Sequence, residues 1–445
     1  MSKNMIQVFL FFSLASLSYS ANAVSLLDAY KTALEEDAGI RGARAALEAG
    51  REKLPQAKSQ LLPSVSANVL RNNNQLISTA ANSPGNDVTS RNEYFSSNKT
   101  VSVRQPIFNL YKFFQYKQAE DSVTEAESAF EKDLQSLTVR VVGAYLDALL
   151  SAEQVQLVLV QKNQFHTLLK AAEKALVLGT GTVTDIDEAK ARLDMAFAQE
   201  LEAKQNQDYT RRQLEILLNR PVLRLHSIKP NGLKALPSLA SDLDGWLDKA
   251  MAQSPEVRMM AARLDAANHE IKKAKSGHAP TLDAVLQWSE SGSENVTRLN
   301  SKYENKSIGF QLTIPLYQGG YVSSTERQAI AERSRNAEAL EALRRDLGVR
   351  IHKEYRGVTE GVLKIRALEQ ALKSSERLLD STRKSVLAGV RSQLDVLNAE
   401  QQVSKANQEL VQSRYQYLMS RLRLYSLSGL DPLNAVEELH SVFEP

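Results

Sequence analysis

The sequence predicts an α-helical barrel joined to a transmembrane β-barrel, assembled from several copies of a chain whose two halves repeat each other. Three observations carry this prediction: amphipathic helices much longer than a domain, strands with one apolar face, and motifs that recur in the same order in both halves. A helix that long must bury its apolar stripe along other helices. Four strands cannot close a barrel, so closure requires a ring-shaped oligomer.

The composition excludes several classes of protein. The chain has 445 residues, of which 43% are hydrophobic and only 6% aromatic, a low aromatic content for a compact enzyme. Its net charge of +3 is too small to indicate nucleic-acid binding. It contains no cysteine, which excludes disulfides, thiolate metal sites, cysteine nucleophiles and the lipid-carrying cysteine of bacterial lipoproteins.

Residues 1–23 have the pattern of a signal peptide. Lys3 precedes an apolar run through Leu17, and Ala21, Asn22 and Ala23 form a small-residue cleavage site. The alternative, a membrane anchor, is disfavoured because the run is too short to span a bilayer. We therefore expect export with cleavage after Ala23.

The first repeat is expected over residues 24–220. A helix from Val24 to Leu62 ends before Pro63, and alternating strands follow around residues 65–69 and 100–104, separated by a polar segment, 71–98, that is expected to be an exposed loop. Apolar residues then recur at steps of three and four from Asn109 to Leu178, which predicts a helix about 100 Å long. After Gly179, a second helix returns from Thr182 to Leu218.

The second repeat is expected over residues 246–430. Strands around 281–288 and 308–314 flank a second expected loop, 289–306. A long helix ends at Gly389, and its return helix runs from Ser392 to Leu427. Residues 221–245 are expected to form a linker or equatorial segment, and residues 431–445 a short, partly ordered tail.

The alternating strands have two interpretations. A soluble antiparallel sheet packed on helices would show the same pattern. The signal peptide and the length of the neighbouring helices favour the transmembrane barrel with a wet lumen.

The two helix turns carry matching motifs. Thr182 to Asp185 and Ser392 to Asp395 both fit Ser/Thr-x-x-Asp, in which the first residue and the acid satisfy free amides at a helix start. This capping role alone accounts for both aspartates. Gly179 and Gly389 are expected to end the preceding helices, since glycine readily adopts the left-handed conformation found there.

The chain resembles the TolC family of outer-membrane efflux and secretion channels over roughly Leu26 to Pro432. The similarity rests on the duplicated layout and on three motifs: Ser-Gly-His-Ala-Pro-Thr-Leu-Asp at 276–283, Ile-Pro-Leu-Tyr-Gln-Gly-Gly at 314–320, and Gly-Val-Arg-Ser-Gln-Leu-Asp-Val-Leu-Asn-Ala at 389–399. It implies a homotrimer with a twelve-stranded outer-membrane barrel in lipid and a periplasmic tunnel of twelve helices. It also implies two kinds of partner, a periplasmic adaptor and an inner-membrane ABC transporter or proton-driven pump.

The resemblance also implies roles at the turns. Asp395 would belong to a negative ring at the periplasmic mouth, with raised carboxyl pKa values, while Arg391, Thr184 and Asp185 would link neighbouring hairpins and hold the mouth shut. Asn398 stands where some members carry a second ring acid, and Val386 where some carry a tyrosine. The turns at Gly179 and Gly389 would be the docking points of the adaptor.

No motif for catalysis, a cofactor or a metal was found. The sequence lacks a phosphate-binding Gly-x-x-x-x-Gly-Lys loop, His-Glu-x-x-His and Gly-x-Ser-x-Gly, and its six histidines show no ligand spacing. We therefore expect a passive export duct rather than an enzyme, with type I protein secretion favoured. The alternatives are the outer-membrane part of a proton-driven multidrug efflux pump and, less favoured, a soluble periplasmic coiled-coil adaptor or scaffold.

Overall fold

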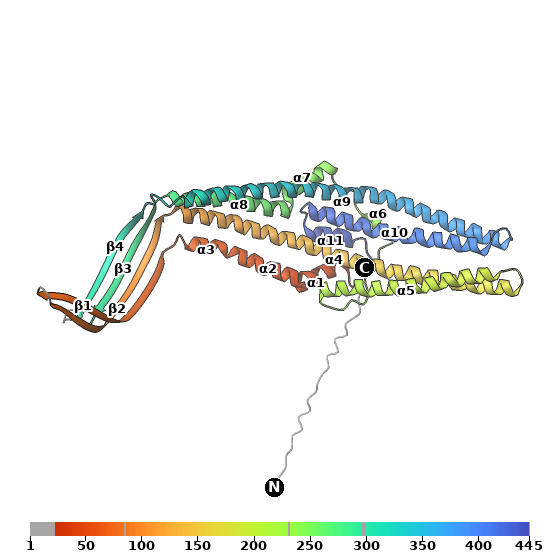
Figure 1. The fold of residues 1–445 in the computed structure, drawn as a ribbon. Coiled ribbons are helices and arrows are strands. Elements are labelled where there is room, and N and C mark those ends of the chain that lie inside the picture. The colour runs from red at the N-terminus through yellow and green to blue at the C-terminus, as the bar shows by residue number, and fades with distance from the viewer. Residues whose placement is uncertain (1–22, 84–85, 230–231, 295–299, 445) are drawn as a thin grey trace, which may run out of the picture.

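The protein is an elongated set of helices with a β-sheet projecting from one end (Figure 1). The structure is a computed structural model that describes residues 23–83, 86–229, 232–294 and 300–444. The expected signal peptide, except for Ala23, lies outside the described residues.

Two very long helices define the length of the molecule. Helix α4, Leu110–Val177, has 68 residues, and helix α9, Tyr321–Leu387, has 67 residues. Each is followed by an antiparallel return helix, α5, Val183–Leu218, or α10, Gln393–Leu427. The predicted rods, turns and return helices are confirmed, with Asn109 capping α4 through a hydrogen bond from the Lys112 amide.

Shorter helices lie beside the sheet-proximal part of the rods. The expected single helix from Val24 to Leu62 is instead three helices: α1, Leu26–Glu36, α2, Ala38–Arg51, and α3, Lys53–Ser59. The first break occurs because the Asp37 carboxylate accepts a 2.9 Å hydrogen bond from the Ile40 amide and so begins a new helix. In the second half, α8, Pro255–Lys275, and the 3₁₀ turn η1, Ser276–His278, take the corresponding place.

The sheet is antiparallel with strand order β1-β2-β3-β4. Its strands are β1, Ser64–Ser83, β2, Asn86–Phe108, β3, Thr281–Ser293, and β4, Ser301–Thr313. The strands are therefore longer than predicted, and the expected loops 71–98 and 289–306 are wrong because most of both segments is strand.

The physical reason is that ladder hydrogen bonds use backbone groups and need no apolar side chains. In the outer part of β1 and β2, polar side chains pair across the strands instead. Asn74 donates to the Ser96 hydroxyl at 2.7 Å, and the hydroxyl groups of Thr79 and Thr89 lie 3.0 Å apart. The polar composition of these segments therefore correctly predicted that their side chains are exposed to solvent, but it did not show that the backbone is irregular.

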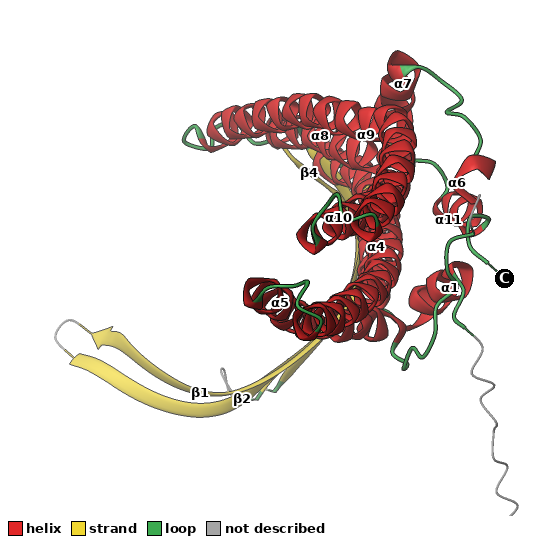
Figure 2. Cartoon of the chain, turned by 90° about the vertical axis from the view of Figure 1, so that its right-hand side faces the viewer, coloured by secondary structure: helices red, strands yellow, loops and turns green. Residues whose placement is uncertain are grey.

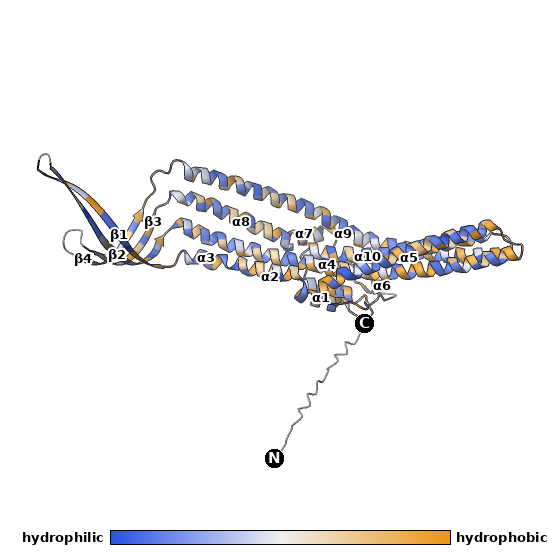
Figure 3. Cartoon of the chain, turned by 60° about the horizontal axis from the view of Figure 1, so that its bottom comes forward, coloured by the Kyte–Doolittle hydropathy of each residue, from blue (hydrophilic) through white to orange (hydrophobic). Residues whose placement is uncertain are grey.

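Viewed along the helices, the chain forms a curved row rather than a closed bundle. Figure 2 shows α9, α10, α4 and α5 along this row, with α1, α6, α7 and α11 on its outer side. Figure 3 shows polar and apolar residues alternating along the long helices. No helix among the described residues combines the length and apolar character needed to cross a membrane.

The main core lies midway along the rods, beneath the linker and the C-terminal tail. The linker contains α6, Gly232–Ala235, and leads into α7, Leu243–Gln253. The tail is more ordered than expected, because it forms α11, Pro432–His440, and buries Val442 and Phe443. The Phe443 ring packs edge-on against Tyr145 of α4 at 5.6 Å.

Arg421 of α10 joins the tail and the linker to the rods. Its side chain is only 1% exposed. Its Nε donates to Glu438 of α11 at 2.6 Å, and its Nη2 donates to the Pro237 carbonyl of the linker at 2.8 Å. Burial and the Glu438 carboxylate both raise the pKa of Tyr425, to about 12, and the Tyr425 hydroxyl also donates to Glu438.

We predict that Arg421→Ala lowers the free energy of unfolding by about 3 to 5 kcal/mol, because it leaves the Glu438 carboxylate without its buried partner. Thermal unfolding of the detergent-purified protein and limited proteolysis of the tail would measure this. Arg356→Ala is the control, since that side chain is 60% exposed and pairs with Glu360 of its own helix, which is 59% exposed. Equal stability of the two variants would contradict the prediction.

Candidate functional site at the hairpin tips

The two hairpin tips have the same turn geometry. Gly179 and Gly389 have φ values of 73° and 72°, in the left-handed region that L side chains rarely adopt. At the first tip the Thr180 amide donates to Ala175, and at the second the Val390 amide donates to Ser385, so both helices end in the same type of cap. A Cβ at either glycine would meet nothing within 4 Å. Backbone conformation rather than crowding therefore favours glycine there.

The predicted capping boxes are present at both return helices. The Asp185 carboxylate accepts from the Thr182 amide at 2.9 Å, and the Asp395 carboxylate accepts from the Ser392 amide at 3.0 Å. Hydrogen bonds from the Ser392 backbone and hydroxyl, followed by the charge of Arg391, lower the pKa of Asp395. The single chain therefore favours the ionised carboxylate, whereas a raised pKa would require other acids nearby.

Apolar side chains surround both turns and are left exposed, a feature that the sequence analysis missed. Val177 and Leu178 are 87% and 76% exposed at the first tip, and Leu387 and Val390 are 90% and 78% exposed at the second. The exposure appears only once the turn geometry is known, and it gives the tips a surface suited to another protein.

The expected latch residues are not brought together within one chain. The Arg391 guanidinium approaches Thr382 of its own hairpin at 3.5 Å, and among the described residues it has no hydrogen bond or ion pair with Thr184 or Asp185. Thr184 is exposed, and Asp185 is engaged in its cap. Val386 packs against a small buried cluster near the tips.

Arg192 of α5 links the two hairpins, and the sequence analysis did not identify it. Its Nη1 donates to Gln401 at 2.8 Å and its Nη2 to Asn398 at 3.1 Å, both on α10. A 2.9 Å bond to Glu188, one turn earlier on α5, orients the guanidinium. The Glu188–Arg192 spacing was visible in the sequence as a helical ion pair, but partners on another helix were not.

A buried cluster and two buried carboxylates hold the helices together near the tips. The cluster draws on all four long helices and comprises Phe165, Leu168, Ala196, Leu379, Val396, Leu397 and Ala399. Glu400 of α10 pairs with Arg383 of α9 at 2.6 Å. Hydrogen bonds from Lys162 and Lys204 lower the pKa of Glu200 on α5. The carboxylate pairs each join the two helices of one hairpin, while the cluster spans both hairpins, so the Arg192 link adds a polar contact beside an apolar one.

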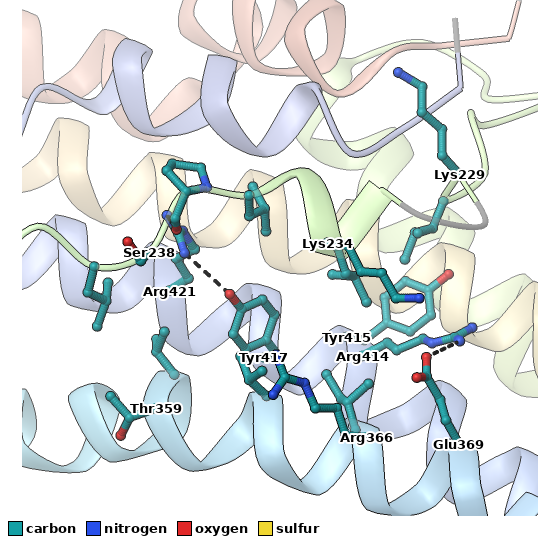
Figure 4. Close-up of a pocket in the computed structure, with 18 of the residues that line it drawn as sticks. Lys229, Lys234, Ser238, Thr359, Arg366, Glu369, Arg414, Tyr415, Tyr417 and Arg421 are labelled. Atoms are coloured by element: carbon teal, nitrogen blue, oxygen red, sulfur yellow. Dashed lines mark hydrogen bonds and ion pairs between the residues drawn. The ribbon is translucent and has the colours of Figure 1, made fainter.

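A groove of about 720 Å³ lies farther from the tips, between the linker and helices α9 and α10 (Figure 4). Six of the polar side chains that line it pair with one another. Arg414 pairs with Glu369 at 3.1 Å, Arg421 donates to the Tyr417 hydroxyl at 3.3 Å, and the Tyr415 hydroxyl donates to Glu153 at 2.7 Å. Burial, followed by Glu153, raises the pKa of Tyr415. This pairing gives the groove a structural role beneath the linker.

No group of three His, Asp or Glu residues in the described part of the chain is placed to hold a metal ion. The histidine with the clearest partner is His269 of α8, whose Nδ1 lies 2.6 Å from Asp121 of α4. That pair joins two packed helices. The candidate functional regions are therefore the hairpin tips and the sheet.

The sequence matches the model of the outer membrane efflux protein family. The family model matches twice, over residues 29–220 and 246–430. Among similar proteins, the alkaline protease secretion protein AprF of Pseudomonas aeruginosa is 34% identical over 92% of this chain and 86% of its own length. The proteases secretion protein PrtF of Dickeya chrysanthemi is 31% identical over 92% and 89%, and the outer membrane protein TolC of Escherichia coli is 25% identical over 96% and 86%.

Solved structures show the same fold at lower sequence identity. CusC superposes with a TM-score of 0.78 at 17% identity and covers 92% of each chain. The outer membrane protein VceC of Vibrio cholerae gives a TM-score of 0.76 at 16% identity, covering 91% of this chain and 96% of its own. These similarities confirm the predicted fold class.

Proposed function

The chain belongs to the outer membrane efflux protein family, and we propose that it is the outer-membrane duct of a type I protein secretion system. The main support for this proposal is the similarity to two protease secretion proteins, each more than 30% identical over 92% of this chain. The sheet lies in the outer membrane and the helices extend into the periplasm. The protein is a passive channel and performs no chemical reaction.

A homotrimer is the assembly that the exposed edges of the chain support. Strands β1 and β4 end the sheet and have no further partner among the described strands. The helices at the ends of the curved row expose large apolar side chains, among them Phe197 and Ile216 of α5 and Val349 and Leu363 of α9. Three copies would supply the twelve strands and twelve helices implied by the family resemblance, and would cover these edges.

The partners proposed are a periplasmic adaptor and an inner-membrane ABC transporter. A chain without a nucleotide-binding motif must obtain energy for export from another protein. The exposed apolar side chains around Gly179 and Gly389 support the tips as the adaptor's docking points. Open space beside both glycines would allow close approach of another backbone.

The efflux alternative has weaker support. The solvent efflux pump outer membrane protein SrpC of Pseudomonas putida is 22% identical over 72% of this chain, compared with 34% over 92% for AprF. A proton-driven pump partner therefore remains the second candidate. A soluble adaptor or scaffold does not agree with membership of the outer-membrane family.

We propose that links between hairpins hold the periplasmic mouth closed. Within a chain, Arg192 would act with Asn398 and Gln401. Between chains, Arg391 would reach Thr184 and Asp185 of the next hairpin. Asp395 would form the ring of three carboxylates, which would attract cations into the mouth.

We predict that deletion of the gene abolishes secretion of the cognate exported protein, because no other part of the system crosses the outer membrane. Activity of the exported protein in the culture medium and antibiotic susceptibility would be measured together. Restored secretion on re-expression is the control. Normal secretion with increased drug susceptibility would instead support the efflux pump.

We predict that Arg192→Ala and Arg391→Ala each raise the mean conductance of single channels in a planar bilayer, because the mouth is open for a larger fraction of the time. For Arg192, loss of the charged hydrogen bonds should raise that open fraction on the order of tenfold. Arg212→Ala is the control, because that exposed side chain pairs only within α5 among the described residues. Unchanged conductance of a variant would remove that arginine from the latch.

We predict that Leu178→Glu and Val390→Glu stop export, because a carboxylate disrupts an apolar contact with the adaptor. The oligomer should remain in the outer membrane, since both side chains point to solvent in the chain. Leu223→Glu is the matched control, because that leucine is 74% exposed in the linker, away from the tips, and the same change there should preserve export. Normal export by both glutamate variants would exclude docking at these residues.

A further inference from the structure

Nearly all charged side chains of the sheet lie on one of its two faces. Residues directly opposite each other in an antiparallel ladder share a face. The register places Ile308, Leu286, Val103 and Val65 in one row across the sheet. The next row on the same face, away from the helices, lies two residues from each of these along its strand. Continuing this register, Arg104 and Asp283 are the only charged residues of the described strand pairs on the opposite, polar face.

Charged residues appear on the apolar face beyond the row of Ile308, on the side away from the helices. The next row holds Lys306, Trp288, Val101 and Ala67, the following row Glu304, Glu290, Lys99 and Val69, and the third Lys302, Gly292, Ser97 and Arg71. We call the charged residues of these three rows the belt. It contains four basic residues, Arg71, Lys99, Lys302 and Lys306, and two acidic ones, Glu290 and Glu304.

Trp288 marks the boundary of the apolar band. Its indole nitrogen donates to Glu304 at 3.0 Å, so one end of the ring is held among polar groups while the side chain stands directly above apolar rows. Tryptophan in this position is typical of the girdles at the edges of outer-membrane barrels. The belt therefore lies at the level of the lipid head groups, on the side away from the helices.

The belt has more positive charge than its own acids neutralise. Glu290 lies between Lys99 and Lys302, at 3.1 Å from each, and Glu304 pairs with Lys306 at 3.0 Å. Arg71 has no ion pair among the described residues and lies over the Phe95 ring at 5.0 Å. The lysine side chains remain 51% to 75% exposed, so each can donate to another acceptor.

We propose that the belt binds the phosphate groups of lipid head groups in the outer leaflet of the outer membrane. This inference rests on the proposed barrel. The opposite face would not recognise such a ligand, because its strands offer mainly hydroxyls and amides, and Arg104 is engaged by Asp283 and Gln311. The occupant is a membrane surface rather than a protein, because the belt continues an apolar band that needs lipid around it.

Titration of the detergent-purified oligomer with lipid A, in forms with and without its phosphates, would test the proposal. The chain has two tryptophans, and Trp246 is only 2% exposed, so a change in emission on lipid addition reports mainly Trp288. We expect the phosphorylated form to bind more tightly, and each lysine changed to glutamine at 99, 302 or 306 to weaken binding by about fivefold.

Two matched variants sharpen the test. The triple change of these lysines to arginine should keep the affinity, and Arg104→Gln on the polar face should leave it unchanged. A variant with all three lysines changed to glutamine should lose most of the phosphate-dependent binding. If that variant fails to assemble, Lys302→Gln alone is used, since that side chain is 69% exposed and has one ion pair. Equal affinity for both forms of lipid A, or unchanged affinity after loss of the lysines, would overturn the proposal.

Single-channel conductance of the same preparations separates this proposal from the proposed function. Channels that conduct normally without phosphate-dependent binding would reject only the belt. A preparation that forms no channels would reject the membrane duct itself.

Discussion

The structure depends on the burial of apolar helix and strand surfaces that one chain cannot cover by itself. Helices α4 and α9 run the length of the molecule, yet the chain arranges its helices as a curved row with two open ends. The sheet likewise ends at β1 and β4, whose outer edges have no partner among the described strands. Because an exposed strand edge and a row of exposed apolar residues both favour association, the fold of the chain supports the proposal that it acts as part of a ring.

Duplication explains how a single chain presents matching features at both tips. Each half ends its rod at a glycine with positive φ and starts its return helix with a capping box. The caps keep Asp185 and Asp395 in defined positions, and the lowered pKa of Asp395 keeps that carboxylate ionised. In the proposed oligomer, the same group that stabilises the turn would also contribute charge at the mouth of the tunnel.

The sequence predicted what depends on local periodicity and failed where backbone or long-range contacts decide. The helix bounds near Asn109, Leu178 and Ser392 were predicted well, since capping residues and glycine act locally. The outer halves of β1 and β2 were assigned to loops because their polar side chains hid a continuous backbone ladder. The Arg192 link was missed because Asn398 and Gln401 lie some 200 positions away along the chain, in the second repeat.

The central claim is that copies of this chain enclose a hollow cylinder that no single copy can form. The most direct measurement is the mass of the processed, purified protein, obtained by native mass spectrometry from detergent. The account predicts a stable homotrimer that requires detergent to remain in solution. A stable monomer that stays soluble in water without detergent would contradict it.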